Sequence, residues 1–220
     1  MNTLFDFNGV LLDDEHVHAA AMAEVLAPLG VTVTLADYFE RYFVFDDREA
    51  FRAALTDAGR APSDEEIARL VRDKEPVYLR RVATEGRPYP GAAALVRAAA
   101  SLGVVGVVSG ALRHEIELAL DLMDLREQVA FIVSAEDTTR SKPDPEGYLL
   151  AKRALTARGH APRAVVVEDS PGGVAAAKAA GLTVAAVLHT SSEERLRDAG
   201  ADLVVARIDE LSIERLAALA

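Results

Sequence analysis

The chain has 220 residues, half of them hydrophobic, which is enough for one large domain or for a domain with a smaller one inserted. Its formal net charge is −11 and its isoelectric point is about 4.9, which argues against nucleic acid and anionic membrane surfaces as partners. The chain contains no cysteine, so disulfides and thiolate chemistry are excluded.

Targeting signals are missing from the sequence pattern. No apolar run approaches the roughly 20 residues that span a bilayer, and the N-terminus has neither the basic flank nor the long apolar region of a signal peptide. We therefore expect a soluble cytoplasmic protein, with its oligomeric state left open and a monomer as a reasonable form. A small phosphorylated metabolite is compatible with the acidic composition, because a single pocket can still be positive.

The first predicted strand is TLFDF, from Thr3, and residues 15 to 88 then read as consecutive amphipathic helices without a convincing strand. Ser63, followed by Glu66, is a plausible capping box for the last of these helices. The helical stretches are HVHAAAMAEVLAPLG, LADYFERYF, DREAFRAALTDAG and SDEEIARLVRDKEPVYLRRVATEG.

From the RPYPG hinge at residues 87–91 onward, short apolar runs alternate with helical ones. Two Ala-rich helices begin at Gly91 and Pro171 and end at Gly103 and Gly181, which are good stop signals. Five further strands are predicted: VVGVVS, VAFIVS, AVVVED, TVAAVL and DLVV.

These runs are continuous rather than alternating, as is typical of strands buried on both faces of a parallel sheet. The pattern predicts an α/β fold, a doubly wound parallel sheet with an inserted helical domain. We assign residues 1–14 and 89–220 to the α/β core and residues 15–88 to the helical insertion.

Ligands of such sheets bind outside the carboxyl ends of the strands. Asp6 follows the first strand, Ser109 the second, and the pair Glu168 and Asp169 the fourth, while Lys142 lies in SKPDPEGY ahead of a helix. Singly, such residues are more often helix caps or solvated charges than catalytic groups. Their occurrence in order, each near a strand end, favours one shared site.

The set fits phosphoryl transfer through an aspartyl intermediate. Asp6 would attack phosphorus, and a Mg²⁺ ion held by Asp6 and Asp169, with Glu168 as a further candidate ligand, would offset the repulsion between carboxylate and phosphate. Ser109 and the N–H groups after it, from Gly110 onward, would bind phosphate oxygens, and Lys142 would neutralise developing charge.

Four segments, DFNGVLLDDE, VVSGA, SKPDPEGY and VVVEDSPGGVAAAKAAG, resemble the four motifs of the haloacid dehalogenase superfamily. The resemblance covers nearly the whole chain and is closest to the branch with β-phosphoglucomutase and sugar-phosphate phosphatases. It implies a Mg²⁺-dependent site with Asp6 as nucleophile, Lys142 as its charge partner, Ser109 on phosphate, and Glu168 and Asp169 at the metal.

The same resemblance implies that the helical insertion is a cap whose side chains reach the substrate. The matching positions are His18, Arg48 and Lys74, although solvated helix faces explain the last two equally well and hinge packing explains His18. Arg113, one helical turn past Ser109, would either help to bind phosphate or only place a positive charge at the start of a helix.

Asn8 departs from the family pattern, which has Asp at this position to protonate the leaving oxygen and then activate water. An Asn side chain cannot exchange this proton, although its backbone carbonyl can still bind Mg²⁺. General acid–base catalysis typically contributes about 10²–10⁴ in rate. Three explanations stay open: a leaving group that needs no proton, another donor such as His18 or Asp13, or a site that binds phosphorylated ligands with impaired catalysis.

We therefore predict a phosphatase for a small phosphorylated metabolite. A sugar phosphomutase depends twice on proton exchange, so Asn8 counts against it. A 2-haloacid dehalogenase tolerates Asn8 but leaves the Glu168–Asp169 pair unused. A phospho-ligand binding protein is the alternative outside the enzymes.

Overall fold

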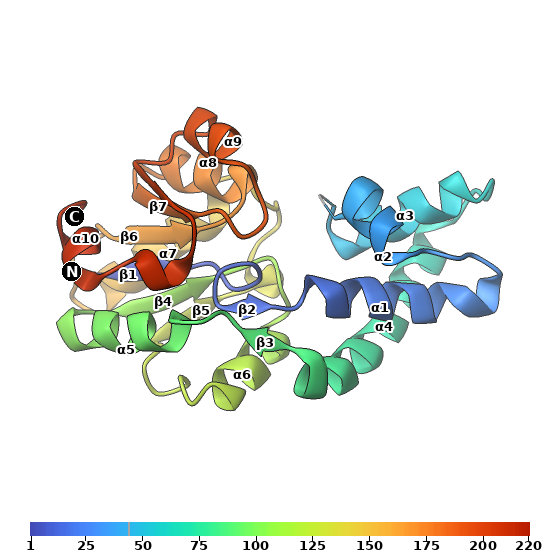
Figure 1. Cartoon of the computed structure of the whole chain (residues 1–220), viewed down its shortest axis with the longest axis horizontal. Coiled ribbons are helices and arrows are strands. Elements are labelled where there is room, and N and C mark those ends of the chain that lie inside the picture. Colours follow the sequence, from blue (N-terminus) through green and yellow to red (C-terminus); the bar gives the residue numbers. More distant parts are fainter. Residues whose placement is uncertain (44) are drawn as a thin grey trace. The chain divides into compact units, whose positions relative to one another are not determined.

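The computed structural model describes residues 1–43 and 45–220 (Figure 1). The chain divides into two compact units, one of residues 1–13 and 88–220 and the other of residues 14–87. Among the described residues, no helix is both long enough and apolar enough to cross a membrane.

The larger unit is built on a six-stranded sheet in the order β5-β4-β1-β6-β7-β8, in which every described pair is parallel. This confirms the predicted α/β class, and each strand lies within one of the six apolar runs. The strands are β1 (Thr3–Phe5), β4 (Val105–Val108), β5 (Phe131–Val133), β6 (Val165–Glu168), β7 (Thr183–Val187) and β8 (Leu203–Val205).

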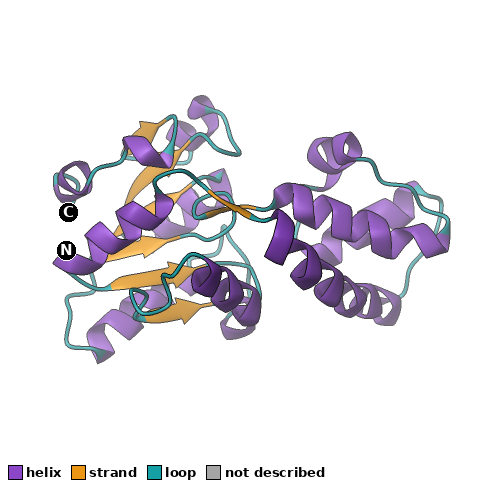
Figure 2. Ribbon diagram, turned by 60° about the horizontal axis from the view of Figure 1, so that its bottom comes forward, coloured by secondary structure: helices purple, strands orange, loops and turns teal. Residues whose placement is uncertain are grey.

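Helices cover both faces of this sheet (Figure 2). Their apolar periodicity buries one stripe of each helix, as in α5 and α7. The helices are α5 (Ala92–Leu102), α6 (Arg113–Leu122), α7 (Glu146–Ala157), α8 (Pro171–Ala179), α9 (Glu193–Asp198) and α10 (Ile213–Ala217), with short 3₁₀ turns η3 (Ala135–Asp137) and η4 (Ile208–Glu210).

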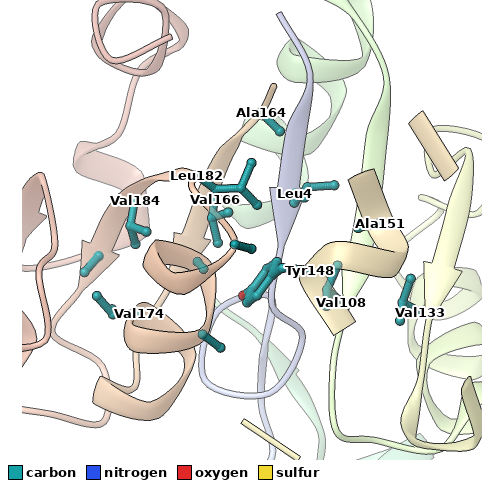
Figure 3. Close-up of a cluster of buried hydrophobic side chains, with 14 of the residues drawn as sticks. Leu4, Val108, Val133, Tyr148, Ala151, Ala164, Val166, Val174, Leu182 and Val184 are labelled. Carbon is teal, nitrogen blue, oxygen red and sulfur yellow. The ribbon is translucent and has the colours of Figure 1, made fainter. Parts of the chain in front are cut away.

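The register of the sheet brings one residue of each central strand onto a shared core face. Leu4 pairs with Val166, which in turn pairs with Val184. These side chains pack with Tyr148 and Val174, from α7 and α8, in the cluster drawn in Figure 3. Because helices cover both faces of the sheet, every residue of β1 and β6 is buried, which explains why their runs are continuously apolar rather than alternating.

The smaller unit is helical and has a core of its own, which includes Met22, Phe51 and Leu70. Ser63 caps α4, its Oγ accepting from the Glu66 N–H at 3.1 Å, whereas the Glu66 carboxylate pairs with Arg60. The elements are α1 (Glu15–Leu26), the 3₁₀ turn η1 (Ala27–Leu29), α2 (Leu35–Asp37), the π-helical turn η2 (Tyr38–Tyr42), α3 (Asp47–Asp57) and α4 (Asp64–Glu85).

Two details differ from the sequence-based prediction. The stretch LADYFERYF is not one α-helix, because its second half winds as a π-helical turn in which the Phe43 N–H donates to the Tyr38 carbonyl. Two short strands were also missed, β2 (Leu12–Asp13) and β3 (Arg87–Pro88), which pair in a separate two-stranded sheet. At two residues each, they carry no detectable periodicity.

Candidate active site

Three carboxylates meet at the carboxyl end of the central strands. Asp6 follows β1, and Glu168 and Asp169 lie at the end of β6, the strand paired with β1. All three are buried, and each places an oxygen within 4.8 Å of the others. Parallel pairing causes this convergence, since it aligns the carboxyl ends of neighbouring strands at one edge.

Lys142 is the cation of this cluster. Its Nζ forms ion pairs with Asp6 Oδ1 at 2.9 Å and with Glu168 Oε1 at 2.5 Å. The two carboxylates raise the pKa of Lys142 well above its usual range despite the opposing effect of burial. The ammonium is therefore charged and lies against the predicted nucleophile.

The carboxylates differ in their electrostatics. Burial and the charge of Glu168 raise the pKa of Asp6 to about 7, although Lys142 opposes the change. Burial and the charges of Glu168 and Asp6 likewise raise the pKa of Asp169. For Glu168, burial is outweighed by Lys142 and by backbone N–H donors, which lower the pKa. A cation next to Asp6 and Asp169 would relieve the crowding of negative charge.

Glu168 is saturated with hydrogen bonds from the protein. Oε1 accepts from Lys142 and from the Tyr148 hydroxyl at 3.0 Å, and Oε2 accepts from the backbone N–H groups of Asp169 and Ser170 and from Ser170 Oγ. A carboxylate offers about four lone-pair positions, so these five donors occupy the capacity of Glu168. The Asp6 and Asp169 oxygens fit a hard divalent cation better.

The segment after β1 holds Asn8 beside Ser109, the serine predicted to bind phosphate. Gly9 has φ of +73°, and its N–H donates to the Leu12 carbonyl, which closes a tight loop. Ser109, at the end of β4, lies with its Oγ 3.4 Å from Asn8 Oδ1 and accepts from the Ala111 N–H at 3.1 Å. The structure therefore brings Asn8 and Ser109 together.

A cavity of about 90 Å³ lies beside this cluster, with Ser109, Gly110, Lys142 and Tyr148 among its lining residues. A Cβ added at Gly110 would meet open space. The volume is well below the roughly 300–1,000 Å³ of typical ligand pockets, so it suits a phosphate-sized group.

Arg113 is engaged elsewhere in this structure. Its guanidinium donates to Asp137 at 2.6 Å and to the Ile132 carbonyl at 3.2 Å, and its backbone N–H donates to Glu136. A role on phosphate would require Arg113 to exchange these partners.

The three cap candidates lie in the helical unit, where two of them are joined. Lys74, 3% exposed, has its Nζ 2.7 Å from His18 Nδ1 and pairs with Asp47. His18 stacks on Tyr78 at 4.3 Å between ring centroids, and the Tyr78 hydroxyl donates to buried Asp14 at 2.5 Å. Lys74 is therefore a buried, partnered cation and not a solvated helix face.

Arg48 is exposed at the start of α3. Sequence reasoning missed three partners of the predicted site residues. Tyr148 contacts Glu168, Asp47 pairs with Lys74, and Asp14 pairs with His18. Tyr148 stands inside the SKPDPEGY motif, but its contact with Glu168 spans 20 positions and leaves no local signal.

A buried acidic cluster with one lysine, at the carboxyl edge of a doubly wound sheet, is an arrangement that suits an α/β enzyme of phosphoryl transfer. The family model for haloacid dehalogenase-like hydrolases matches residues 3–181, and the chain belongs to this family. The predicted family and enzyme class are thereby confirmed: the chain is a hydrolase of the kind that cleaves phosphate esters.

The curated relatives include phosphatases. The chain is 29% identical to validoxylamine A 7'-phosphate phosphatase of Streptomyces hygroscopicus subsp. limoneus, over 89% of each protein. It is 29% identical to hexitol phosphatase B of Escherichia coli (strain K12), over 97% of this chain and 95% of that protein. A 32% match to SUPPRESSOR OF QUENCHING 1 of Arabidopsis thaliana covers 96% of this chain but spans only a fifth of the longer protein.

A solved structure with the same fold is an aspartate-to-asparagine mutant of CbbY from Rhodobacter sphaeroides, crystallised in complex with xylulose-1,5-bisphosphate. It superposes with a TM-score of 0.84 at 29% sequence identity, over 98% of both chains.

Proposed function

We propose that this protein is a Mg²⁺-dependent phosphatase that hydrolyses a small phosphorylated metabolite of the sugar-phosphate class. The observation that carries the proposal is the group of buried Asp6 and Asp169 with the partly exposed Lys142, which would serve as nucleophile, metal ligand and charge partner, respectively. The phosphatase relatives and the sugar bisphosphate bound to the CbbY mutant support the substrate class.

The metal site is assigned to Asp6, Asp169 and the main-chain carbonyl of Asn8. The donor set is all oxygen, as Mg²⁺ prefers. Burial and neighbouring carboxylates raise the pKa of Asp6 and of Asp169, and a divalent cation bound to both would offset this crowding of negative charge. A bound Mg²⁺ would offset the charge of the phosphoryl group. Because Glu168 is saturated, we assign it to holding Lys142 and place it at the metal only in a supporting position.

In the first step, a carboxylate oxygen of Asp6 forms a bond to phosphorus, and the bond from phosphorus to the substrate oxygen breaks. Lys142 stabilises the charge on the phosphoryl oxygens, together with the Ser109 hydroxyl and the Gly110 N–H. In the second step, water attacks the aspartyl-phosphate, which releases inorganic phosphate and restores Asp6. The leaving oxygen in step one gains a proton, and the water in step two loses one.

Asn8 cannot carry that proton, so we propose that turnover is fastest for substrates with weakly basic leaving groups. His18, Arg48 and Lys74 are proposed to contact the rest of the substrate. Lys74 would then exchange one of its present partners, His18 or Asp47, for a substrate oxygen.

A phospho-ligand binding protein is the second candidate, and Asn8 is the observation that favours it. The CbbY mutant is a protein of this fold that was crystallised in complex with a sugar bisphosphate. This candidate predicts Mg²⁺-dependent binding without release of phosphate.

One experiment separates the two. A panel of phosphorylated metabolites is assayed for phosphate release with and without Mg²⁺, with p-nitrophenyl phosphate and 2-haloacids alongside. The phosphatase proposal expects Mg²⁺-dependent release that Asp6→Asn abolishes, since an amide is a far poorer nucleophile. Wild-type turnover in Asp6→Asn would overturn the mechanism, and tight binding without release would favour the binding protein.

A further inference from the structure

His189 and Thr190 follow β7 and stand beside the candidate site, yet they take no part in the two phosphoryl-transfer steps. His189 Nδ1 lies 2.7 Å from the Gly9 carbonyl oxygen, and His189 Nε2 lies 3.2 Å from the Ile208 backbone nitrogen. The ring also stacks on Tyr89, with 3.8 Å between centroids and 18° between the planes. The imidazole thus joins the loop after β1 to the segment after β8.

The two partners of this ring determine its protonation. A carbonyl oxygen can only accept a hydrogen bond, and a backbone N–H can only donate one. His189 Nδ1 must therefore carry the proton and donate to Gly9, while Nε2 accepts from Ile208 as an unprotonated nitrogen. Burial lowers the pKa of His189, which favours this neutral ring.

Thr190 contacts the metal-site carboxylate from the same segment. Its hydroxyl donates to Asp169 Oδ2 and lies 3.3 Å from the Asp169 carbonyl oxygen. A Cβ at Gly9 would overlap the Asp169 carboxylate and would lie 3.1 Å from the Thr190 methyl group. The Asn8–Gly9 loop, Asp169 and Thr190 are thus in direct packing contact.

We propose that His189 and Thr190 are positioning residues of the phosphoryl-transfer site. The hydrogen bond from His189 fixes the position of the Gly9 carbonyl and thereby the conformation of the loop that follows Asp6 and contains Asn8. Thr190 fixes the rotation of the Asp169 carboxylate. Partners behind metal ligands typically change metal affinity or activity by about 10–100-fold when they are lost. The assignment of roles rests on the proposed function, whereas the geometry of the ring does not.

The first experiment determines the protonation state of the His189 ring. Long-range ¹H–¹⁵N spectra of the protein labelled at histidine distinguish the two neutral tautomers from the cation, and His189→Gln identifies the signal of His189. The expected result at neutral pH is a neutral ring with the proton on Nδ1. A proton on Nε2, or a cationic ring, would overturn the positioning of Gly9 by His189, whatever the protein catalyses.

A matched pair of variants then tests the consequence. Asn carries its side-chain nitrogen at the place of Nδ1 and can still donate to Gly9, whereas Gln reaches the place of Nε2 and can still accept from Ile208. We expect His189→Asn to keep kcat/KM for p-nitrophenyl phosphate within about threefold and His189→Gln to lower it by about 10-fold or more. Equal losses, or no loss in either variant, would refute the proposal.

Thr190 offers a second pair, read by calorimetric titration with Mg²⁺ alone. Thr190→Ser keeps the hydroxyl and should keep the affinity for Mg²⁺, whereas Thr190→Val keeps the shape and should weaken it by about 10-fold. Equal affinities in the two variants would remove Thr190 from the site. If the wild-type protein releases no phosphate, the proposed function fails, and these tautomer and titration results still decide the positioning roles.

Discussion

At the scale of single residues, Asn8 stands where the resemblance to the family leads us to expect an aspartate. Its Oδ1 lies 3.4 Å from Ser109 Oγ, so the carboxamide stands at the edge of the cluster around Asp6 and Lys142. His18, a candidate replacement donor, has its Nδ1 2.7 Å from Lys74 Nζ and its Nε2 3.4 Å from Asp14 Oδ2. Both ring nitrogens are thus engaged within the helical unit.

Restoring the carboxylate by Asn8→Asp should reveal how much the missing acid matters. A sugar alkoxide needs a proton to leave, whereas an aryl phosphate leaves as a weakly basic phenolate. We expect sugar-phosphate turnover to rise by about 100-fold or more and aryl-phosphate turnover to rise less. Small, equal changes in kcat for both substrates would mean that another group already supplies the proton, and His18→Ala would then be assayed next.

The crowded carboxylates predict an unusual dependence of stability on pH. The folded-state pKa of Asp6 is about 7, raised from 3.8 by burial, and that of Asp169 is raised as well. The folded protein therefore binds more protons than the unfolded chain from about pH 4 to pH 7, and the free energy of unfolding falls as pH rises through that window. The destabilising effect of Asp6 on the metal-free protein is therefore largest above pH 7, and the raised pKa of Asp169 acts in the same direction.

Asp169→Asn isolates this effect, because other titrating groups are shared with the wild type. In EDTA, we expect the unfolding free energy of the variant to increase relative to that of the wild type as pH rises above the ordinary pKa of an aspartate, because the folded-state pKa of Asp169 is raised. Excess Mg²⁺ should stabilise the wild type and not the variant, since only the wild type keeps the ligand. Urea unfolding curves measure both, and parallel pH profiles in EDTA would contradict the prediction.

At the scale of elements, the turn from β6 into α8 is built around Glu168. Its carboxylate accepts from the N–H groups of Asp169 and Ser170, and Ser170 Oγ in turn caps the helix by accepting from the Gly173 N–H at 3.0 Å. An added Cβ at Gly173 would overlap the Glu168 carboxylate, whereas at Gly172 the nearest atom would be 3.9 Å away. We therefore expect alanine substitutions at these two adjacent glycines to have opposite effects.

Gly173→Ala should lower the free energy of unfolding by about 1–3 kcal/mol, the usual effect of overpacking a filled site. It should also reduce turnover, because Glu168 holds Lys142 against Asp6. Gly172→Ala should be neutral or stabilising by roughly 0.5–1 kcal/mol, since alanine favours the helix. Denaturant unfolding and phosphate release measure both variants, and similar behaviour of the two would refute this account of the turn.

At the scale of the whole molecule, the chain forms two compact units with separate apolar cores. The chain passes between them at only two places, near residues 13–14 and 87–88. Two short connections permit rigid-body motion, and enzymes commonly use such motion to enclose a substrate and exclude water. We infer that the helical unit serves as a mobile cap.

Motion of the cap can be tested with spin labels at two introduced cysteines, because the chain has no cysteine of its own that would react with the label. Glu65, in the helical unit, and Arg153, in the α/β unit, are both exposed and suit labelling. We expect the distribution of distances between the labels to shorten or narrow when Mg²⁺ and a phosphate analogue are added together. A distribution that does not respond would count against closure, and a pair of labels within the α/β unit serves as the control.

The sequence by itself determined the six strands of the main sheet and the residues that follow them at its carboxyl edge. Continuous apolar runs such as AVVVED predict buried parallel strands, and parallel strands bring their ends together. Asp6, Ser109 and Asp169 could therefore be assigned to one site from the pattern of strands alone. Applied also to β7, the same rule would have pointed to His189 and Thr190, which follow that strand.

Only the tertiary structure decided what each polar group is bonded to. Glu168, expected at the metal, lies in the cluster with Asp6 and Asp169, and its oxygens also accept from Tyr148 and Lys142, 20 and 26 positions away. The tautomer of His189 depends on Gly9 and Ile208, at opposite ends of the chain. Periodicity reports which face of an element is buried, whereas hydrogen-bond partners depend on distances between elements, which no local pattern encodes.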